Sequence, residues 1–268
     1  MIKRVFVIGL DGAGNAIKDV ETPNIDLIIK EGAYTYEGDT ARPPISGECW
    51  GSLFHGVPAH KHLLNNDVVK KNPYPEDSVY PSFMKLVRQE WEDCSLAAFS
   101  CWGPINRGII EESTNCYCIS KPDKDLIHEI IDYIGKNDPR VLFVQFDDID
   151  DKGHTYGYRS KEYNDEIRLK DNYVGMLIDA IKKADMFEDS LIIVTADHGG
   201  GGTDIKSHSS DHPLNTKIFW GCYGPTVNRG FNIEEEVNIM DTAAVVAYAL
   251  GLDIPDEWDA KVPGGIFR

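Results

Sequence analysis

Leu191-Ile-Ile-Val-Thr-Ala-Asp-His-Gly-Gly-Gly-Gly202 is the most informative part of the sequence. Its first half is apolar and β-branched, the pattern of a strand buried on both faces of a parallel sheet. Adjacent side chains of a regular strand point to opposite faces, so Asp197 and His198 can serve one site only if the chain leaves β geometry there. The four glycines that follow allow such a turn. A carboxylate beside an imidazole suits a divalent metal, although a surface turn would also carry these residues.

On both sides of this stretch, apolar runs typical of strands alternate with amphipathic runs typical of helices. Strands are predicted at residues 4–10, 95–102, 140–146, 191–196 and 217–223. Helices are predicted at residues 22–32, 45–56, 79–91, 123–136, 163–183 and 241–250, with loops at 38–44 and 57–75. This order predicts an α/β fold, a three-layer α/β/α sandwich with a mostly parallel central sheet. Because no repeat or linker interrupts it, residues 1–268 are expected to form a single domain without a large cap.

The composition excludes several classes of partner. A formal net charge of −17 argues against a nucleic-acid surface and against binding to an anionic membrane. No apolar run approaches the roughly 20 residues of a membrane-spanning helix, and residues 5–8 are too short a run for the core of a secretion signal. The six cysteines show no Cys-x-x-Cys spacing, so a reduced, cytoplasmic protein is expected.

Acidic and histidine side chains recur where the predicted strands end. The candidate metal ligands are Asp11, Asp150, His154, Asp197, His198 and His208. Ligand sites of open α/β sheets lie beyond the carboxyl ends of the strands, so these side chains are expected to meet. They are more ligands than one zinc ion uses. They suit two divalent ions that clamp the attacking and leaving oxygens of a displacement at phosphorus.

Asp11 lies within Gly9-x-x-Gly12-x-Gly14, which invites comparison with a dinucleotide-binding loop. The spacing is not G-x-G-x-x-G, and the aspartate would face the pyrophosphate. We therefore interpret Asp11 as a metal ligand, with a structural turn as the alternative. A Rossmann-type nucleotide-binding protein is a further alternative, and NAD binding in the absence of metal would support it.

Ser46 opens the helix predicted at residues 45–56, and Gly56 ends it. A serine in this position can be a simple helix cap. It can also be a nucleophile, because a helix N-terminus stabilises anions and a nearby metal activates a hydroxyl group. Both roles stay open at this point.

Together these motifs resemble the alkaline phosphatase superfamily, and within it the type I phosphodiesterase / nucleotide pyrophosphatase branch. The likeness begins at Val7-Ile-Gly-Leu-Asp-Gly12 and ends near the helix predicted at residues 241–250. Its most specific parts are Asp150-Asp-Lys-Gly-His154 and Thr195-Ala-Asp-His-Gly199. The resemblance implies an alkaline phosphatase-like catalytic domain.

The resemblance also implies two metal sites. One ion would be held by Asp150, His154 and His208. The other would be held by Asp11, Asp197, His198 and Ser46. Ser46 would be the nucleophile, a position where many relatives carry threonine, and Asn66 would hold a non-bridging phosphate oxygen. Zinc is the expected ion because carboxylate and imidazole ligands are mixed, with manganese as the alternative.

Two of these assignments keep an alternative. His212 could take the place of His208, although His208 has the family's distance to the following strand. Asn65 could take the place of Asn66, because this loop has an additional histidine and lacks a glycine after His62.

The expected function is a metal-dependent hydrolase that cleaves phosphodiesters or nucleotide pyrophosphates, small phosphate-ester substrates, through a phosphoseryl intermediate. A sulfatase would need x-Pro-x-Arg after its nucleophile, and Gly47-Glu-Cys-Trp50 stands there instead. A phosphomonoesterase or phosphonate hydrolase of the same superfamily is the alternative, but the Ser46 helix lacks an arginine to balance a dianion. The rival from another class is a non-catalytic metal-binding protein on the same scaffold.

Four aromatic residues are candidates for stacking on an aromatic leaving group, with packing as their alternative role. They are Trp50, Tyr74, Tyr80 and Trp102.

Overall fold

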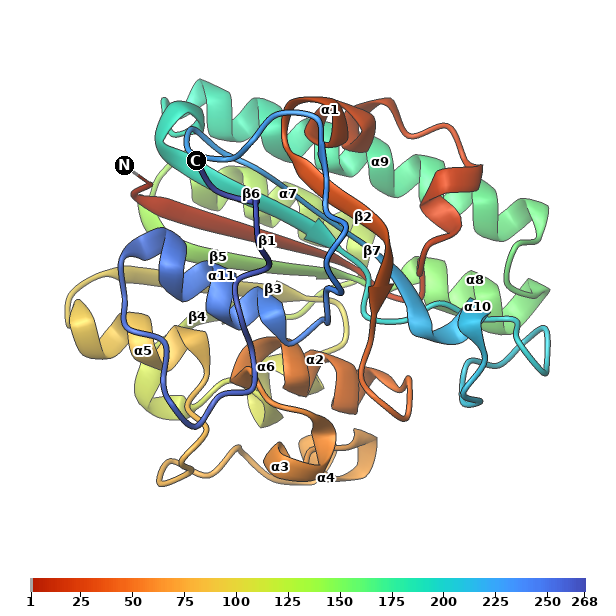
Figure 1. Ribbon diagram of the computed structural model, residues 1–268, viewed down its shortest axis with the longest axis horizontal. Coiled ribbons are helices and arrows are strands. Elements are labelled where there is room, and N and C mark those ends of the chain that lie inside the picture. The colour runs from red at the N-terminus through yellow and green to blue at the C-terminus, as the bar shows by residue number, and fades with distance from the viewer. Residues whose placement is uncertain (1) are drawn as a thin grey trace.

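Eight strands form one mixed sheet in the order β4-β3-β5-β1-β6-β7-β2-β8 (Figure 1). The computed structural model describes residues 2–268. The strands are β1 Arg4–Leu10, β2 Ala33–Asp39, β3 Ser95–Ser100, β4 Tyr117–Ile119, β5 Pro139–Phe146, β6 Ser190–Thr195, β7 Lys217–Tyr223 and β8 Phe231–Asn232. Only β7 pairs antiparallel with its neighbours, β6 and β2. The predicted mostly parallel sheet is therefore confirmed.

The centre of the sheet is buried on both faces. β1 pairs in parallel with β5 and with β6, so that Val7 lies opposite both Phe143 and Ile193. All three side chains are fully buried. The continuous apolar runs of these strands are explained by this position, because each strand must cover two helical layers.

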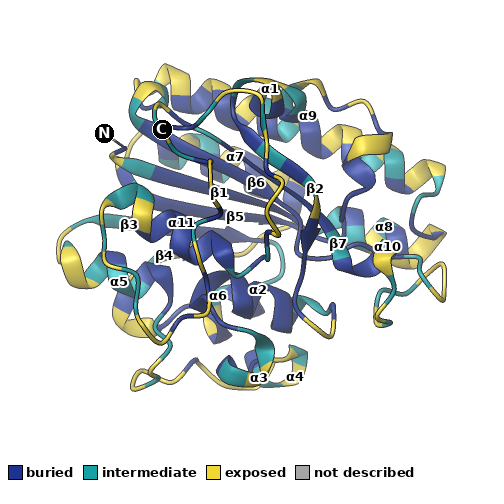
Figure 2. Ribbon diagram, viewed as in Figure 1, coloured by how far each residue is buried: buried dark blue, intermediate teal, exposed yellow. Residues whose placement is uncertain are grey.

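Helices cover both faces of the sheet (Figure 1). One layer contains α1 Pro23–Glu31, α7 Asp123–Ile134 and α9 Lys161–Lys183, with α8 Asp148–Tyr156 packed on α9. The other layer contains α2 Ser46–His55, α5 Phe83–Glu90 and α11 Asp241–Leu250. Figure 2 shows that the central strands are buried and that the exposed residues lie on the outer faces of the helices and in the loops. This arrangement confirms the predicted three-layer sandwich.

The loops predicted at residues 38–44 and 57–75 hold more structure than expected. Strand β2 was missed, because its polar and aromatic residues are ordered by antiparallel pairing with β7, a contact distant in sequence. The connection at 57–75 contains α3 Ala59–His62 and α4 Asn66–Lys71. Such short helices carry no detectable periodicity and depend on packing.

Further short elements connect the main ones. They are η1 Ala16–Asp19, α6 Pro104–Gly108, η2 Glu112–Thr114, η3 Phe187–Asp189 and α10 Pro213–Thr216. Within residues 2–268, no helix is long and apolar enough to cross a membrane. All six cysteines are free thiols. The cytoplasmic location and the single-domain organisation stay predictions.

Candidate two-metal active site

Asp11, Asp197 and His198 meet beyond the carboxyl ends of β1 and β6. Parallel pairing of these two strands brings their ends to one edge of the sheet. His198 Nε2 lies 3.6 Å from Asp11 Oδ1 and 3.3 Å from Asp197 Oδ2. All three side chains are buried, with at most 1% exposed. The predicted departure from β geometry is present, since β6 ends at Thr195.

Each carboxylate of this group has one oxygen engaged and one oxygen free. Asp197 Oδ1 accepts the N–H groups of Gly12 and His198 at 3.0 and 2.8 Å. Asp11 Oδ2 accepts from Trp50 Nε1 at 3.0 Å and from Gln145 Nε2 at 2.8 Å. Asp11 Oδ1 and Asp197 Oδ2 are buried without a hydrogen-bond partner. Because unpaired buried oxygens are costly, these atoms fit a divalent cation.

A second group lies on the other side of His198. Asp150, His198 and His208 offer ligand atoms within 4.8 Å of one another. The rings of His198 and His208 stack with centroids 3.8 Å apart. His154 stands outside this group but next to it, with Nε2 at 3.2 Å from Asp150 Oδ2. Asp150 and His154 both belong to α8, where residues four apart share one face.

The three histidines share one hydrogen-bonding pattern at Nδ1. The Nδ1 atoms of His154, His198 and His208 lie 2.8, 2.9 and 2.6 Å from backbone carbonyl oxygens. A carbonyl oxygen can only accept, so each Nδ1 carries a proton and each Nε2 is directed to the site. Nε2 of His198 and of His208 can keep a lone pair for a metal, whereas His154 Nε2 donates to Asp150 and would give up this proton to a metal. Such outer hydrogen bonds are typical of histidines that bind metal. Both donor groups therefore fit divalent ions.

Charge in the site is unbalanced without a cation. Burial raises the pKa of Asp11 well above its ordinary value, and the neighbouring carboxylates of Asp197, Asp147 and Asp150 raise it further. Burial also raises the pKa of Asp197 to about 7. Burial lowers the pKa of His208 to about 4, with a further contribution from His198. A bound divalent ion would lower the pKa of the two carboxyl groups and so favour their ionised form, and it would further favour the neutral imidazole of His208.

Asp150 and His154 behave as a pair. Burial alone would raise the pKa of Asp150, but the hydrogen bond from His154 and the nearby histidines outweigh it and hold this pKa below its ordinary value. The same hydrogen bond raises the pKa of His154 to about 9. Tyr158 also donates its hydroxyl proton to Asp150 Oδ1. The carboxylate is thus ionised and oriented.

Ser46 is the first residue of α2, with Ile45 as the cap. Its Oγ lies 3.4 Å from His198 Nε2, at the edge of the first donor group. The following N–H group, of Gly47, donates to Asn66 Oδ1 at 2.8 Å. A Cβ atom on Gly47 would lie 2.6 Å from the backbone at Asn65 and Asn66, so only glycine permits this close approach.

The structure bears on two choices that the sequence left open, Asn65 or Asn66 and His208 or His212. Asn65 caps its own helix, since its side chain accepts from the N–H groups of Asp67 and Val68. His212 likewise accepts from the N–H group of Leu214 and caps α10. Asn66 and His208 instead face the site. The geometry therefore favours the residues that were preferred from the sequence.

Three side chains that hold the ligands were not assigned this role from the sequence: Trp50, Gln145 and Tyr158. Trp50 was a stacking candidate, but it is fully buried and donates to Asp11. Gln145 offered a signal, because it is a polar residue inside the otherwise apolar strand β5. Tyr74 is also buried and stacks on His55 at 3.8 Å, so packing explains it.

Comparison with solved structures identifies the fold. Murine ectonucleotide pyrophosphatase / phosphodiesterase 5 superposes with a TM-score of 0.78 at 16% identity, over 98% of this chain and 100% of that chain. A 2-O GAG sulfatase superposes with a TM-score of 0.80 at 12% identity, over 97% and 73% of the two chains. The fold is that of the alkaline phosphatase superfamily.

Within this class, residues 69–251 match the type I phosphodiesterase / nucleotide pyrophosphatase family, and the chain belongs to that family. The match begins after Asp11 and Ser46, so the placement of these two rests on the geometry above.

Curated relatives cover the chain only in part. Ectonucleotide pyrophosphatase/phosphodiesterase family member 7 of Mus musculus is 24% identical over 235 residues, 78% of this chain and 52% of that protein. GPI ethanolamine phosphate transferase 1 of Saccharomyces cerevisiae is 26% identical over 155 residues, 51% of this chain and 17% of that protein. The chain thus matches about half of the former and a much smaller part of the latter. The family and these relatives support phosphoryl transfer as the type of chemistry.

Proposed function

We propose that the protein is a two-metal hydrolase that cleaves phosphodiesters or nucleotide pyrophosphates with Ser46 as the nucleophile. The observation that carries this proposal is the convergence of two unpaired carboxylate oxygens, Asp11 Oδ1 and Asp197 Oδ2, with His198 Nε2 beside the Ser46 hydroxyl. A surface turn or a helix cap has no need for such buried, unpaired oxygens.

Two sets of residues would hold the ions, which we propose to be zinc, with manganese as the alternative. The first set is Asp11, Ser46, Asp197 and His198. The second is Asp150, His154 and His208. When bound, divalent ions would balance the charge on phosphate oxygens and lower the pKa of the serine hydroxyl.

The protein's own residues then account for transfer. Ser46 Oγ forms a bond to phosphorus as the bond to the leaving oxygen breaks, and hydrolysis of the phosphoseryl ester regenerates the serine. Asn66 Oδ1 is held by the Gly47 N–H group, which leaves the Asn66 amide N–H groups to donate to a non-bridging oxygen. The N-terminus of α2 adds a favourable dipole for an anion.

We expect a diester to be the preferred substrate, because helix α2 and Asn66, which lie on the side of the nucleophile, present no positively charged side chain to the phosphate. Helix α2 carries no lysine or arginine, and Asn66 is uncharged. A monoester dianion would lack a cationic partner there beyond the ions themselves. We therefore propose phosphodiesterase activity over phosphomonoesterase activity.

The test combines metal content with turnover of bis(p-nitrophenyl) phosphate and p-nitrophenyl phosphate. We expect about two ions per chain and a higher kcat/KM on the diester. Asp197→Asn should lose metal and turnover together, whereas Asp204→Asn, an exposed acid in the neighbouring loop, should keep both. Bound metal without turnover of any ester would indicate a non-catalytic metal-binding protein, and faster monoester cleavage would indicate a phosphomonoesterase.

A further inference from the structure

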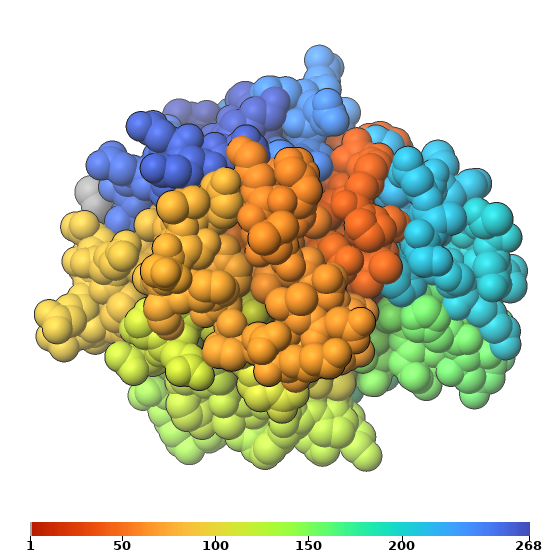
Figure 3. All heavy atoms as spheres, turned by 90° about the horizontal axis from the view of Figure 1, so that it is seen from below, coloured from red at the N-terminus to blue at the C-terminus, as the bar shows by residue number. Residues whose placement is uncertain are grey.

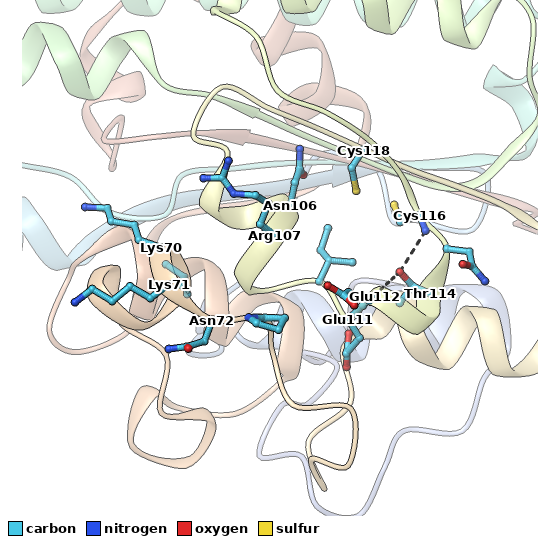
Figure 4. Close-up of a pocket in the computed structure, with 14 residues that line it drawn as sticks. Lys70, Lys71, Asn72, Asn106, Arg107, Glu111, Glu112, Thr114, Cys116 and Cys118 are labelled. Atoms are coloured by element: carbon cyan, nitrogen blue, oxygen red, sulfur yellow. Dashed lines mark hydrogen bonds between the residues drawn. The ribbon is translucent and has the colours of Figure 1, made fainter.

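A cavity of about 520 Å³ lies between α4 and α6, next to the helix that carries Asn66. We call it the α4–α6 pocket, and Figure 4 shows its lining side chains. We propose that this pocket binds a second anionic group of the substrate, of the size of a phosphate, beside the scissile phosphate. This inference rests on the proposed function, and it implies that the protein favours diesters that carry a second anionic group.

The charge of the pocket is opposite to that of the molecule. Lys70, Lys71 and Arg107 line it, although the chain as a whole has a net charge of −17. Across residues 2–268, neither Lys70 nor Arg107 has an ion-pair partner, and Lys71 has only a 3.8 Å contact with exposed Asp67. Lys70 and Arg107 lie at one end of the pocket, away from Cys116 and Cys118 (Figure 4). Unpaired cations at one end of a cavity suit an anionic ligand.

The two carboxylates of the pocket do not cancel these charges. Glu111 is 1% exposed and accepts from the N–H group of Ser82 at 2.8 Å and from the Ser82 hydroxyl group. These hydrogen bonds hold the Glu111 carboxylate against Ser82 without neutralising it. Glu112 is exposed at the rim. The lining thus holds three cations, Lys70, Lys71 and Arg107, against two carboxylates, which leaves an excess of one positive charge.

The pocket is close to the place proposed for the scissile phosphate. Asn66 and Lys70 are four residues apart on α4, so their side chains share one helix face with Cβ atoms about 6 Å apart. Helical side chains also lean toward the helix N-terminus, which directs Lys70 toward Asn66. On the other wall, α6 follows β3, the neighbour of β5 in the sheet. One substrate can therefore reach both places along the carboxyl edge of the sheet.

The walls of the pocket are already fixed. A Cβ atom on Gly108 would lie 2.2 Å from the carbonyl oxygen of Val69, so α4 and α6 are in direct backbone contact. Asn106 Nδ2 donates to Ile119 O and Ser120 Oγ, both at 3.0 Å, and this ties α6 to β4. Figure 3 shows the α4 segment (orange) beside the α6–β4 segment (yellow-green) on the surface. Binding then requires little rearrangement, which favours affinity.

The test uses two substrates that differ by one phosphate: thymidine 5′-(p-nitrophenyl phosphate) with and without a 3′-phosphate. We expect kcat/KM to be about tenfold higher for the 3′-phosphorylated compound, as one charge-assisted contact provides. The double variant Lys70→Gln/Arg107→Gln should abolish this preference and leave cleavage of the unphosphorylated compound within about twofold of wild type. The matched control is Lys183→Gln, an exposed lysine on α9 that should keep the preference.

Equal kcat/KM for both compounds in the wild type, or an unchanged preference in the double variant, would overturn the inference while leaving the proposed function intact. Failure of the proposed function has a different signature, the absence of p-nitrophenol release from either compound. Calorimetric binding of thymidine 3′,5′-bisphosphate against thymidine 5′-monophosphate then decides the inference. Tighter binding of the bisphosphate that is lost in the double variant supports the pocket, and equal binding removes it.

Discussion

Every histidine proposed as a ligand presents the same nitrogen to the site. The Nδ1 atoms of His154, His198 and His208 are each held by a backbone carbonyl oxygen. These carbonyl groups belong to Lys206, Gly199 and Pro44, so the loops around the site fix the imidazole rings before any ion binds. Preorganisation of this kind raises metal affinity because the rings lose little freedom on binding.

The two histidines of the loop after β6 give the first prediction. His208→Ala should reduce the metal content by about one ion per chain, because a site missing a ligand binds weakly. His212→Ala should leave the metal content unchanged and cost about 1 kcal/mol at most, since it removes only a helix cap. Metal analysis of the purified variants measures both, and the reverse pattern would move the ligand to His212.

Among single residues, the candidate ligands were predictable from the sequence, but the side chains that hydrogen-bond to them were not. Asp197 and His198 could be recognised from their place before a glycine run. Trp50 and Gln145 could not be assigned to Asp11, because their hydrogen bonds join residues 39 and 134 positions apart in the chain. The choice between Asn65 and Asn66 likewise needed the structure, which shows which of them caps α4.

At the scale of elements, helix α8 carries Asp150 and His154 and is anchored by a buried ion cluster. Lys170 of α9 is fully buried and lies 3.0 Å from Asp123 and from Asp148, and 2.6 Å from Glu166. Asp123 also accepts the N–H groups of Asp147 and Asp148, at the start of α8, at 3.0 Å. This cluster thus joins α7, α8 and α9.

Removing the central charge of this cluster gives the second prediction. Lys170→Met should destabilise the protein by about 3–5 kcal/mol, because it leaves Asp123 buried without a counter-charge. Lys161→Met is the matched control on the same helix, since its pair with Asp165 is exposed and should be worth no more than about 1 kcal/mol. Urea denaturation of both variants gives the two free energies of unfolding. Similar small losses would show that the cluster does not anchor α8.

Helix α2 is supported by His62 of α3, and this contact predicts a pH dependence. His62 Nε2 lies 3.1 Å from Ser52 Oγ, and Nδ1 accepts the N–H group of Leu64 at 3.0 Å, so the ring must be neutral. Burial lowers the pKa of His62 from 6.5 to about 3. Below pH 6.5 His62 binds a proton in the unfolded chain but stays neutral in the folded protein. The free energy of unfolding therefore falls as the pH drops from 6.5 toward 3.

The corresponding variant should weaken this dependence. His62→Gln is expected to be less stable than wild type at pH 7 but to lose less on acidification, where one proton is worth up to about 1.4 kcal/mol per pH unit. His60→Gln, which changes an exposed histidine of the same helix, should retain the wild-type dependence. Denaturation curves at pH 7 and pH 5 are the measurement. An unchanged slope in His62→Gln would place the titrating group elsewhere.

Helices and strands were predictable where their own residues show amphipathic periodicity or a continuous apolar run. The long amphipathic helix α9 and the apolar strands β1, β5 and β6 were located from sequence to within a few residues. Strand β2 was not, because its order depends on β7 nearly 200 residues away. Helices α3 and α4 were missed for the same reason, since each is stabilised by packing on α2.

At the scale of the whole molecule, the sheet order explains why distant residues form one site. β5, β1 and β6 are neighbours in parallel, so the segments after them, residues 147–154, 11 and 197–198, meet at one edge. Helix α2 of the opposite layer brings Ser46 to the same edge. The class of fold was predictable from the sequence, and so was the meeting of the acidic and histidine side chains at this edge, because the carboxyl ends of parallel strands lie together. The α4–α6 pocket did not, since its walls come from short elements.

Turnover of bis(p-nitrophenyl) phosphate by Ser46→Ala distinguishes a nucleophilic Ser46 from a serine that only caps a helix. We predict a folded variant that keeps most of its metal and loses roughly 10⁴-fold or more in kcat, as enzymes do when a covalent nucleophile is removed. Ser46→Thr, which retains a hydroxyl group, should recover much of this loss. If Ser46→Ala instead turns over the diester at the wild-type rate, Ser46 has no covalent role and the proposed phosphoseryl route is wrong.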